Sequence, residues 1–268
     1  MRTRFAPSPT GRLHLGHALA AKVAHDFARE AGGVFLLRHE DIDGPRVRGE
    51  FYQGIEDDLK WLGLIWDGEP LRQTTRTAAY TAALDSLREM GLVYPCYCTR
   101  REIQEEWARM GAAPQGDEAP VYPGTCRGRQ VEDARFAWRL DSGKASALAG
   151  PLTFRDHRCG EIPVEARLLG DVVLARKDIG SAYHLAVVVD DAFQGITHVT
   201  RGEDLMSSTH VHRLLQAVLG LPEPQYFHHR LVLDESGKRL AKRNDALSIA
   251  TLRERGLSPL AVLAMLGE

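Results

Sequence analysis

Apolar and polar residues divide the first part of the chain into short strands and helices. Residues 3–6 have the composition of a strand, and apolar residues recur at helical spacing over 18–31 until Gly32 and Gly33 end the pattern. Residues 34–38 form an apolar run that predicts a second strand. This order of strand, turn, helix and strand predicts a parallel β-α-β unit, whose ligands bind at the C-terminal ends of the strands.

The pattern changes in the middle of the chain. Helical spacing continues over 47–62 and 77–90, and Gly91 ends the second of these helices. Residues 95–128 are rich in Pro, Gly, Cys and Arg, and residues 135–178 have the pattern of short strands and turns. We therefore expect residues 1–94 to form the first half of an α/β domain and residues 95–180 to form an inserted α+β subdomain.

A second α/β half is predicted after the insertion, over residues 181–235. Buried-strand composition returns at 183–189 and 196–200, and a helix is expected over about 209–219 with Ser207 or Ser208 as its N-cap. Residues 236–268 contain a basic segment and a short helical tail.

Composition narrows the class of protein. The chain has 268 residues, of which 44% are hydrophobic, which is enough for one large domain with an insertion. It contains no apolar run of about 18 residues and no N-terminal signal pattern, so we expect a cytoplasmic protein without a membrane partner. The net charge of -2 means that any RNA surface must be a local patch, and arginines do cluster at 46–48, 127–139 and 238–243. We expect a monomer.

The segment that follows the first strand has the features of a nucleotide site. Residues 4–17 read RFAPSPTGRLHLGH, in which a rigid proline-containing loop leads into a helix that begins near His14. A helix N-terminus attracts phosphate, and His14 and His17 lie on one helical face, where they can stabilise the charge of a departing pyrophosphate. Gly16 leaves room for an adenine or a ribose to approach the backbone.

This segment resembles the HIGH signature of the class I aminoacyl-tRNA synthetases, in the form seen in glutamyl-tRNA synthetases. The resemblance runs from Arg4 to about Asp245 and includes RHEDID at 38–43, VDD at 189–191 and VTRGED at 199–204. It implies a Rossmann-type catalytic domain with an inserted subdomain that binds the RNA acceptor.

The resemblance also implies the site residues and the chemistry. Glu40 would take the ammonium group of glutamate, and Arg4 and Arg201 would share its two carboxylates in an order that stays open. The glutamate α-carboxylate would attack the α-phosphate of ATP, which brings Mg²⁺, to give glutamyl-adenylate. The implied L-glutamate site comprises Arg4, Phe5, Ala6, Pro7, Ser8, Glu40, Tyr183 and Arg201. The implied ATP site comprises Thr10, His14, Gly16, His17 and Lys242, of which His14, His17 and Lys242 are catalytic.

Lys242 belongs to the segment KRLAKR at 238–243, which resembles the second class I signature, KMSKS. A mobile basic loop of this kind can close over a triphosphate, with Lys242 facing the pyrophosphate. The match is imperfect, since Arg239 replaces the usual first lysine and Ala241 replaces the usual serine. Because Ala241 lacks the serine hydroxyl, we expect one contact to be missing and the loop to close less tightly over the triphosphate.

The cysteines suggest a metal site in the insertion. Cys96 and Cys98 are separated from Tyr122 and Cys126 by a polar loop that can fold back to close a tetrahedral site. C-x-C is not the usual zinc spacing, so the spacing alone leaves buried thiols without metal as an alternative. The arrangement resembles a branch of the family in which Cys, Cys, Tyr and Cys bind one structural Zn²⁺, with Cys159 or His157 as an alternative fourth ligand to Tyr122.

The length after Lys242 separates two hypotheses. Only 26 residues follow, whereas a glutamyl-tRNA synthetase normally continues with a large helical anticodon-binding region. The chain could be a truncated or non-standard glutamyl-tRNA synthetase that charges a tRNA 3′ end. We prefer a short paralogue that activates glutamate without tRNA and transfers it to queuosine in the anticodon stem-loop of tRNA(Asp). A small-molecule nucleotidylyltransferase and a non-catalytic zinc RNA-binding protein are remote alternatives.

Overall fold

Three parallel strands form the N-terminal sheet of the computed structural model, which describes residues 1–109, 121–129, 136–176, 180–232 and 248–267. The order is β1 (Arg2–Phe5), β2 (Val34–His39) and β3 (Leu71–Arg72). The parallel β-α-β unit predicted from the sequence is therefore confirmed.

The first helix, α1 (Leu15–Glu30), lies against β1 through a stripe of small residues. Ala18, Ala21, Ala24 and Ala28 are buried, and the close approach lets the Thr3 hydroxyl donate to the Ala24 carbonyl at 2.7 Å. The helix begins three residues before the predicted 18–31, directly after His14. The predicted helices at 47–62 and 77–90 are confirmed as α2 (Gly49–Trp61) and α3 (Thr77–Glu89), the latter followed by Gly91 at a φ of 67°.

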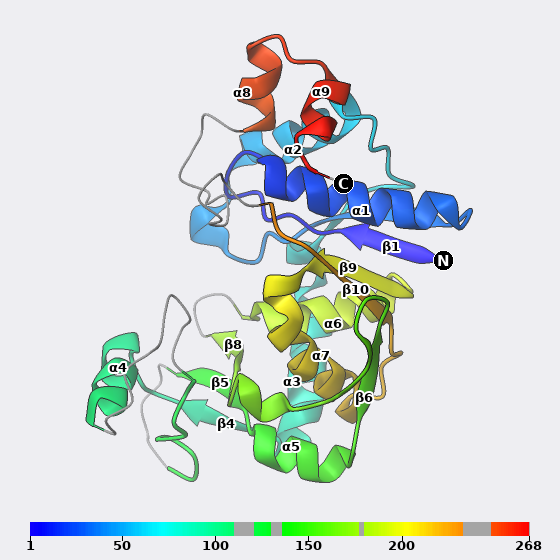
Figure 1. The fold of residues 1–268 in the computed structure, drawn as a ribbon. Coiled ribbons are helices and arrows are strands. Elements are labelled where there is room, and N and C mark those ends of the chain that lie inside the picture. Colours follow the sequence, from blue (N-terminus) through cyan, green and yellow to red (C-terminus); the bar gives the residue numbers. More distant parts are fainter. Residues whose placement is uncertain (110–120, 130–135, 177–179, 233–247, 268) are drawn as a thin grey trace.

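A second sheet meets the first at β1. Its order is β7 (Gly160–Pro163), β6 (Thr153–Asp156), β10 (Gln225–His229) and β9 (His198–Gly202), with only β7 antiparallel to its neighbour. The Thr197 amide donates to the Arg2 carbonyl at 3.0 Å, and the Arg2 amide donates to the Thr197 hydroxyl at 2.8 Å. The beginnings of β1 and β9 therefore lie side by side (Figure 1).

A third, antiparallel sheet of β4 (Val93–Cys96), β5 (Ala137–Leu140) and β8 (Val173–Arg176) lies in the predicted insertion with α4 (Arg100–Arg109). The insertion also contains α5 (Ser142–Ala149), where we expected only strands and turns. Asp141 caps this helix by accepting from the Lys144 amide at 3.0 Å. The hairpin of β6 and β7 extends the sheet of β9 and β10, so this part of 95–180 packs with the second half of the chain.

Two predictions for the second half were wrong. Residues 183–189 form part of a helix, α6 (Tyr183–Phe193), because a short apolar run fits a buried helix as well as a strand. Helix α7 (Met206–Val218) begins after Leu205, so Ser207 and Ser208 lie in its first turn and do not cap it. Figure 1 shows α6 and α7 packed together below β9 and β10.

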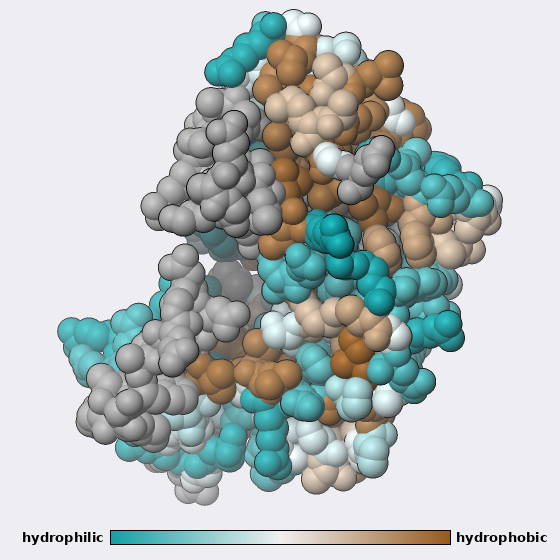
Figure 2. Space-filling model, in the orientation of Figure 1, coloured by the Kyte–Doolittle hydropathy of each residue, from teal (hydrophilic) through white to brown (hydrophobic). Residues whose placement is uncertain are grey.

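The C-terminal tail forms two short helices, α8 (Ile249–Glu254) and α9 (Pro259–Ala264), as expected. They contact α2 and α1, and the Ile249 amide donates to the Leu13 carbonyl at 2.8 Å. Figure 2 shows apolar surface on this part of the molecule, where Leu260 and Met265 are exposed. Among the helices of the described ranges, none is both long and apolar enough to cross a bilayer. Short 3-10 turns occupy Gly44–Arg46, Gln73–Arg76, Ala166–Leu168 and Glu203–Leu205.

Candidate active site

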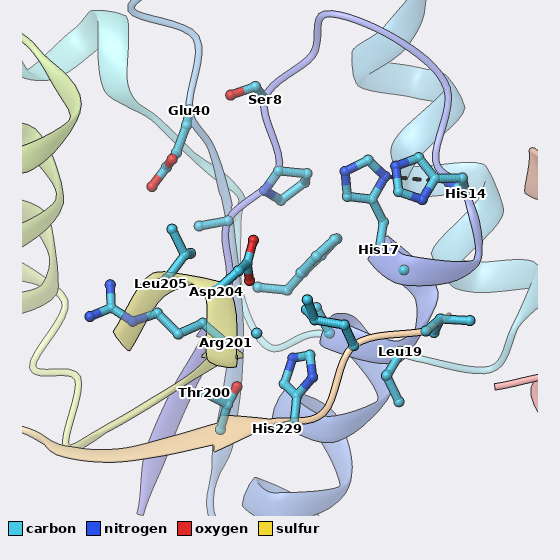
Figure 3. Close-up of a pocket in the computed structure, with 18 of the residues that line it drawn as sticks. Ser8, His14, His17, Leu19, Glu40, Thr200, Arg201, Asp204, Leu205 and His229 are labelled. Carbon is cyan, nitrogen blue, oxygen red and sulfur yellow. Dashed lines mark hydrogen bonds between the residues drawn. The ribbon is translucent and has the colours of Figure 1, made fainter. Parts of the chain in front are cut away.

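A cavity of about 340 Å³ opens where the C-terminal ends of β1, β2 and β9 meet the start of α1 (Figure 3). This is the edge at which open parallel sheets bind ligands. Most of the residues predicted from the sequence line this cavity: Arg4, Phe5, Ala6, Pro7, Ser8, His14, Gly16, His17, Glu40, Tyr183 and Arg201. Thr10 lines an adjoining cavity, and Lys242 lies outside the described residues.

The start of α1 presents two histidines whose rings are in contact, tilted by 33° to each other. The His14 amide donates to Nδ1 of His17 at 3.3 Å, and the centres of the two rings are 3.8 Å apart (Figure 3). A Cβ atom at Gly16 would lie 3.3 Å from Cε1 of His14. Gly16 therefore makes room for the His14 ring, a role that the sequence analysis did not foresee.

A buried network of two arginines and two carboxylates supports the other wall of the cavity. Arg4 contacts both carboxylate oxygens of Asp191, from Nε at 2.8 Å and from Nη2 at 3.2 Å. Nη1 of Arg38 also donates to Asp191 at 2.8 Å, and Nη2 contacts Glu40 at 3.4 Å. Burial acts to raise the pKa of Asp191, but the two guanidinium groups outweigh it and the pKa is lowered. Asp191 is thus the charged anchor of this network.

Arg38 and Asp191 lie within the RHEDID and VDD motifs, but no role for either residue followed from the sequence. Asp191 lies 153 residues from Arg38 and 187 residues from Arg4 along the chain, so spacing within a motif could not reveal these contacts.

Glu40 follows the end of β2, and its carboxylate points into the cavity (Figure 3). Burial raises its pKa, whereas the charges of Arg38 and Arg4 act in the opposite direction. Its amide donates to the Pro7 carbonyl at 3.0 Å, which ties the loop after β1 to the end of β2. The carboxylate is therefore held at a fixed place in the cavity wall.

Arg201 is placed differently from the other two buried arginines. Its guanidinium contacts His228 Nε2 at 3.2 Å, His212 Nδ1 at 3.1 Å and the Thr209 hydroxyl. Within the described part of the chain, no carboxylate forms an ion pair with it, although the residue is only 5% exposed. A buried guanidinium without a paired carboxylate is suited to bind an anionic ligand.

Tyr183 and His229 also line the cavity. Tyr183 is the first residue of α6, and burial raises the pKa of its hydroxyl. His229 ends β10 and contacts the Arg230 carbonyl through Nδ1 at 2.8 Å, whereas its Nε2 has no hydrogen-bond partner among the described residues (Figure 3). Sequence reasoning missed His229 because β10 itself was not predicted.

Three of the four cysteines of the insertion gather as predicted. The sulfur atoms of Cys96, Cys98 and Cys126 lie within 4.8 Å of one another. The Tyr122 hydroxyl lies 3.5 Å from Cys98 Sγ and accepts from the Cys126 amide at 2.8 Å. Three thiols and a phenol oxygen around one point fit the donor set of a tetrahedral Zn²⁺ site.

The alternative fourth ligands lie elsewhere. His157 and Cys159 are in the β6–β7 hairpin, where Cys159 is exposed and the His157 ring contacts those of Phe27 and His198. Neither belongs to the cysteine cluster, so Tyr122 is the candidate that remains.

A second cavity, of about 600 Å³, connects the first to the cysteine cluster. The two cavities share Ser8, Glu40 and Tyr183. The lining of the second is basic and includes Arg46, Arg100, Arg139 and Arg176. A polyanion can therefore approach the smaller cavity from this side.

Comparison with known proteins identifies the family of this fold. Residues 1–268 match the model of the catalytic domain of class I tRNA synthetases (E and Q). A glutamyl-Q tRNA(Asp) synthetase of Rhodobacter capsulatus is 49% identical over 278 residues, with all of both chains covered, and one of Nocardia farcinica is 47% identical, with 98% of this chain and 82% of the relative covered.

Solved structures agree with this match. A glutamate tRNA ligase from Elizabethkingia meningosepticum, in complex with its amino acid, is 30% identical with a TM-score of 0.76. The alignment covers 91% of this chain and 52% of that one.

Proposed function

The chain belongs to the class I tRNA synthetases of the E and Q group, and from this premise we propose that it activates L-glutamate with ATP and transfers it to queuosine in the anticodon of tRNA(Asp). Family membership makes it a ligase that works with ATP and tRNA. The observation that supports glutamate as the amino acid is the buried Arg201, which forms no ion pair with a described carboxylate and lines one small cavity together with Glu40.

The geometry suggests how glutamate lies in the cavity. Figure 3 shows Arg201 and the histidine pair of α1 on opposite sides. The α-carboxylate must reach the α-phosphate of ATP beside the histidines, so the side-chain carboxylate lies at Arg201 and the ammonium group at Glu40. We propose this orientation for the two carboxylates, whose assignment the sequence left open.

Activation then requires positioning and charge stabilisation. An oxygen of the α-carboxylate attacks the α-phosphate in line, the bond to the β-phosphate breaks, and pyrophosphate leaves. His14, His17 and the N-terminus of α1 stabilise the growing negative charge, with Lys242 as the cation expected from the basic segment. Mg²⁺ accompanies ATP and offsets phosphate charge. No protein nucleophile takes part.

The described residues on either side of 233–247, the range that contains the basic segment, lie near this site. Val232 lines the cavity, and Ser248 forms a β-bridge with His14. The positions of these two residues support the proposal that Lys242 acts at the phosphates.

The second cavity is the entry that we propose for the acceptor nucleoside. It adjoins the activated carbonyl through Ser8 and Glu40, and its arginines suit an RNA backbone. A hydroxyl of the nucleoside attacks the carbonyl carbon of glutamyl-adenylate, and AMP leaves. The names of the two relatives above support queuosine-bearing tRNA(Asp) as this acceptor.

The zinc site has a structural role in this proposal. Cys96, Cys98, Tyr122 and Cys126 would supply all four ligands, which leaves no open position for chemistry. Bound metal would tie β4 to the segment of Tyr122 and so shape one side of the second cavity.

Glutamate-dependent exchange of labelled pyrophosphate into ATP tests the first step. We expect exchange with glutamate in the absence of RNA, and much less with glutamine or aspartate. A requirement for tRNA would instead support an ordinary glutamyl-tRNA synthetase. Absence of exchange in metal-replete protein would contradict the proposal.

A further inference from the structure

The three buried arginines of the site differ in the charge of their partners. Arg4 and Arg38 share the carboxylate of Asp191, and Glu40 lies beside Arg38. Arg201 instead donates to two imidazole nitrogens and one hydroxyl, from Nε, Nη1 and Nη2 respectively. All three of these partners are buried.

Hydrogen bonding fixes both histidines as neutral acceptors. His212 accepts from Arg201 at Nδ1, so its one proton lies on Nε2, which is 3.1 Å from Nδ1 of His184. His228 donates from Nδ1 to Asp156 at 2.7 Å, which leaves Nε2 as the acceptor for Arg201. Burial and the nearby guanidinium charge lower the pKa of His212 well below its usual range and that of His228 to about 4.

The carboxylate that His228 contacts on its other side is already engaged. Asp156 accepts from the backbone amides of Arg158, Cys159 and His228, and one imidazole ring separates it from Arg201. The guanidinium is thus held firmly in place while its positive charge stays available on the cavity side.

We propose that His212, with His228 and Thr209, selects an acidic over an amide side chain by positioning Arg201 through neutral acceptors only. A carboxylate in any of these places would pair with Arg201 and make the cavity suitable for a neutral substrate such as glutamine. The inference rests on the proposed function, since it assumes that Arg201 meets the side chain of the amino acid. His212 acts through Arg201 and is a positioning residue.

Two substitutions at one position separate charge from hydrogen bonding. In His212→Asn the amide oxygen stands in the place of Nδ1 and remains a neutral acceptor, whereas His212→Asp puts a carboxylate there. The same pair at His210 is the matched control, because His210 lies on the same helix but accepts from the Glu165 amide at 2.9 Å. The rate of pyrophosphate exchange is measured at varied concentrations of glutamate, glutamine and ATP, which gives kcat and the KM for each substrate.

We expect His212→Asn to keep the KM for glutamate within threefold of the wild type. His212→Asp should raise it at least tenfold and lower the preference for glutamate over glutamine at least tenfold, with kcat and the KM for ATP changed by less than threefold. Both His210 variants should keep the wild-type preference for glutamate over glutamine.

The inference is overturned if His212→Asp behaves like His212→Asn, or if both lose the preference equally. If His212→Asp does not fold, Thr209→Asp with Thr209→Asn as its neutral match repeats the comparison. If neither aspartate variant folds, His212→Asn decides alone, since a tenfold rise in its KM for glutamate contradicts the inference and a retained KM supports it. Wild-type protein that shows no glutamate-dependent exchange would instead overturn the proposed function.

Discussion

Replacing Asp191 with asparagine removes the carboxylate that Arg4 and Arg38 share. The two guanidinium groups contact it through three N–H groups at 2.8 to 3.2 Å, and the Arg38 side chain is fully buried. Removing one partner of such a buried network costs about 3–5 kcal/mol, because uncompensated charge is left inside the protein. For a chain of this size, that loss corresponds to a fall in Tm of roughly 10 °C.

The neighbouring residue supplies the control. Asp190 is also fully buried, but it accepts mainly from the neutral groups of Gln73 and Tyr80, and its cationic partner Arg76 is partly exposed. Asp190→Asn should therefore cost less, roughly 1–3 kcal/mol.

Urea unfolding followed by circular dichroism gives both free energies of unfolding under the same conditions. If Asp191→Asn destabilises the protein no more than Asp190→Asn does, the carboxylate of Asp191 does not hold Arg4 and Arg38 in the way described.

Three further outcomes are expected. Asp58→Asn should raise the Tm at pH 7 and have little effect below about pH 4. Burial raises the folded-state pKa of Asp58 to about 6 from an ordinary value of 3.8, so ionisation of this carboxyl opposes folding as the pH rises. Thermal melts over a pH series check this, and a difference in Tm between variant and wild type that does not shrink toward pH 4 would contradict it. Cys126→Ser should lower the amount of bound zinc at least tenfold, as measured by elemental analysis, whereas Cys159→Ser should bind as much zinc as the wild type. Equal amounts of zinc in the two variants would contradict the assigned site. His17→Asn should lower kcat of pyrophosphate exchange by about 10²-fold with the KM for glutamate changed by less than threefold, and an effect confined to that KM would contradict its place at the phosphates.

The parts of the fold that could be predicted have strong local patterns. The stripe of alanines in α1 and the apolar run of β2 each fit one kind of element, so the first β-α-β unit followed from the sequence. The apolar start of α6 was wrongly assigned to a strand because its few residues satisfy both periods. β10 was missed because Gln225 and two histidines interrupt its apolar pattern.

In the candidate site, too, only the parts with a local sequence pattern could be predicted. Residues within contiguous motifs, such as His14 and Glu40, could be named from the sequence as candidates, and they do line the cavity. The contacts that hold the site together could not be read, since Arg201 meets His212 and His228 only after α7 and β10 pack beside β9. The neutral surroundings of Arg201 are a property of tertiary packing.

We propose above that the activated glutamate goes to a nucleoside of the anticodon. The most direct measurement is transfer of labelled glutamate, with ATP, to an isolated anticodon stem-loop of tRNA(Asp) that carries either queuosine or guanosine. This RNA has no acceptor end, so labelling of the 3′ terminus by an ordinary synthetase reaction is excluded. We predict stable labelling of the queuosine stem-loop and none of the guanosine one. Equal labelling of the two, or labelling only of a full-length tRNA at its 3′ end, would contradict the account.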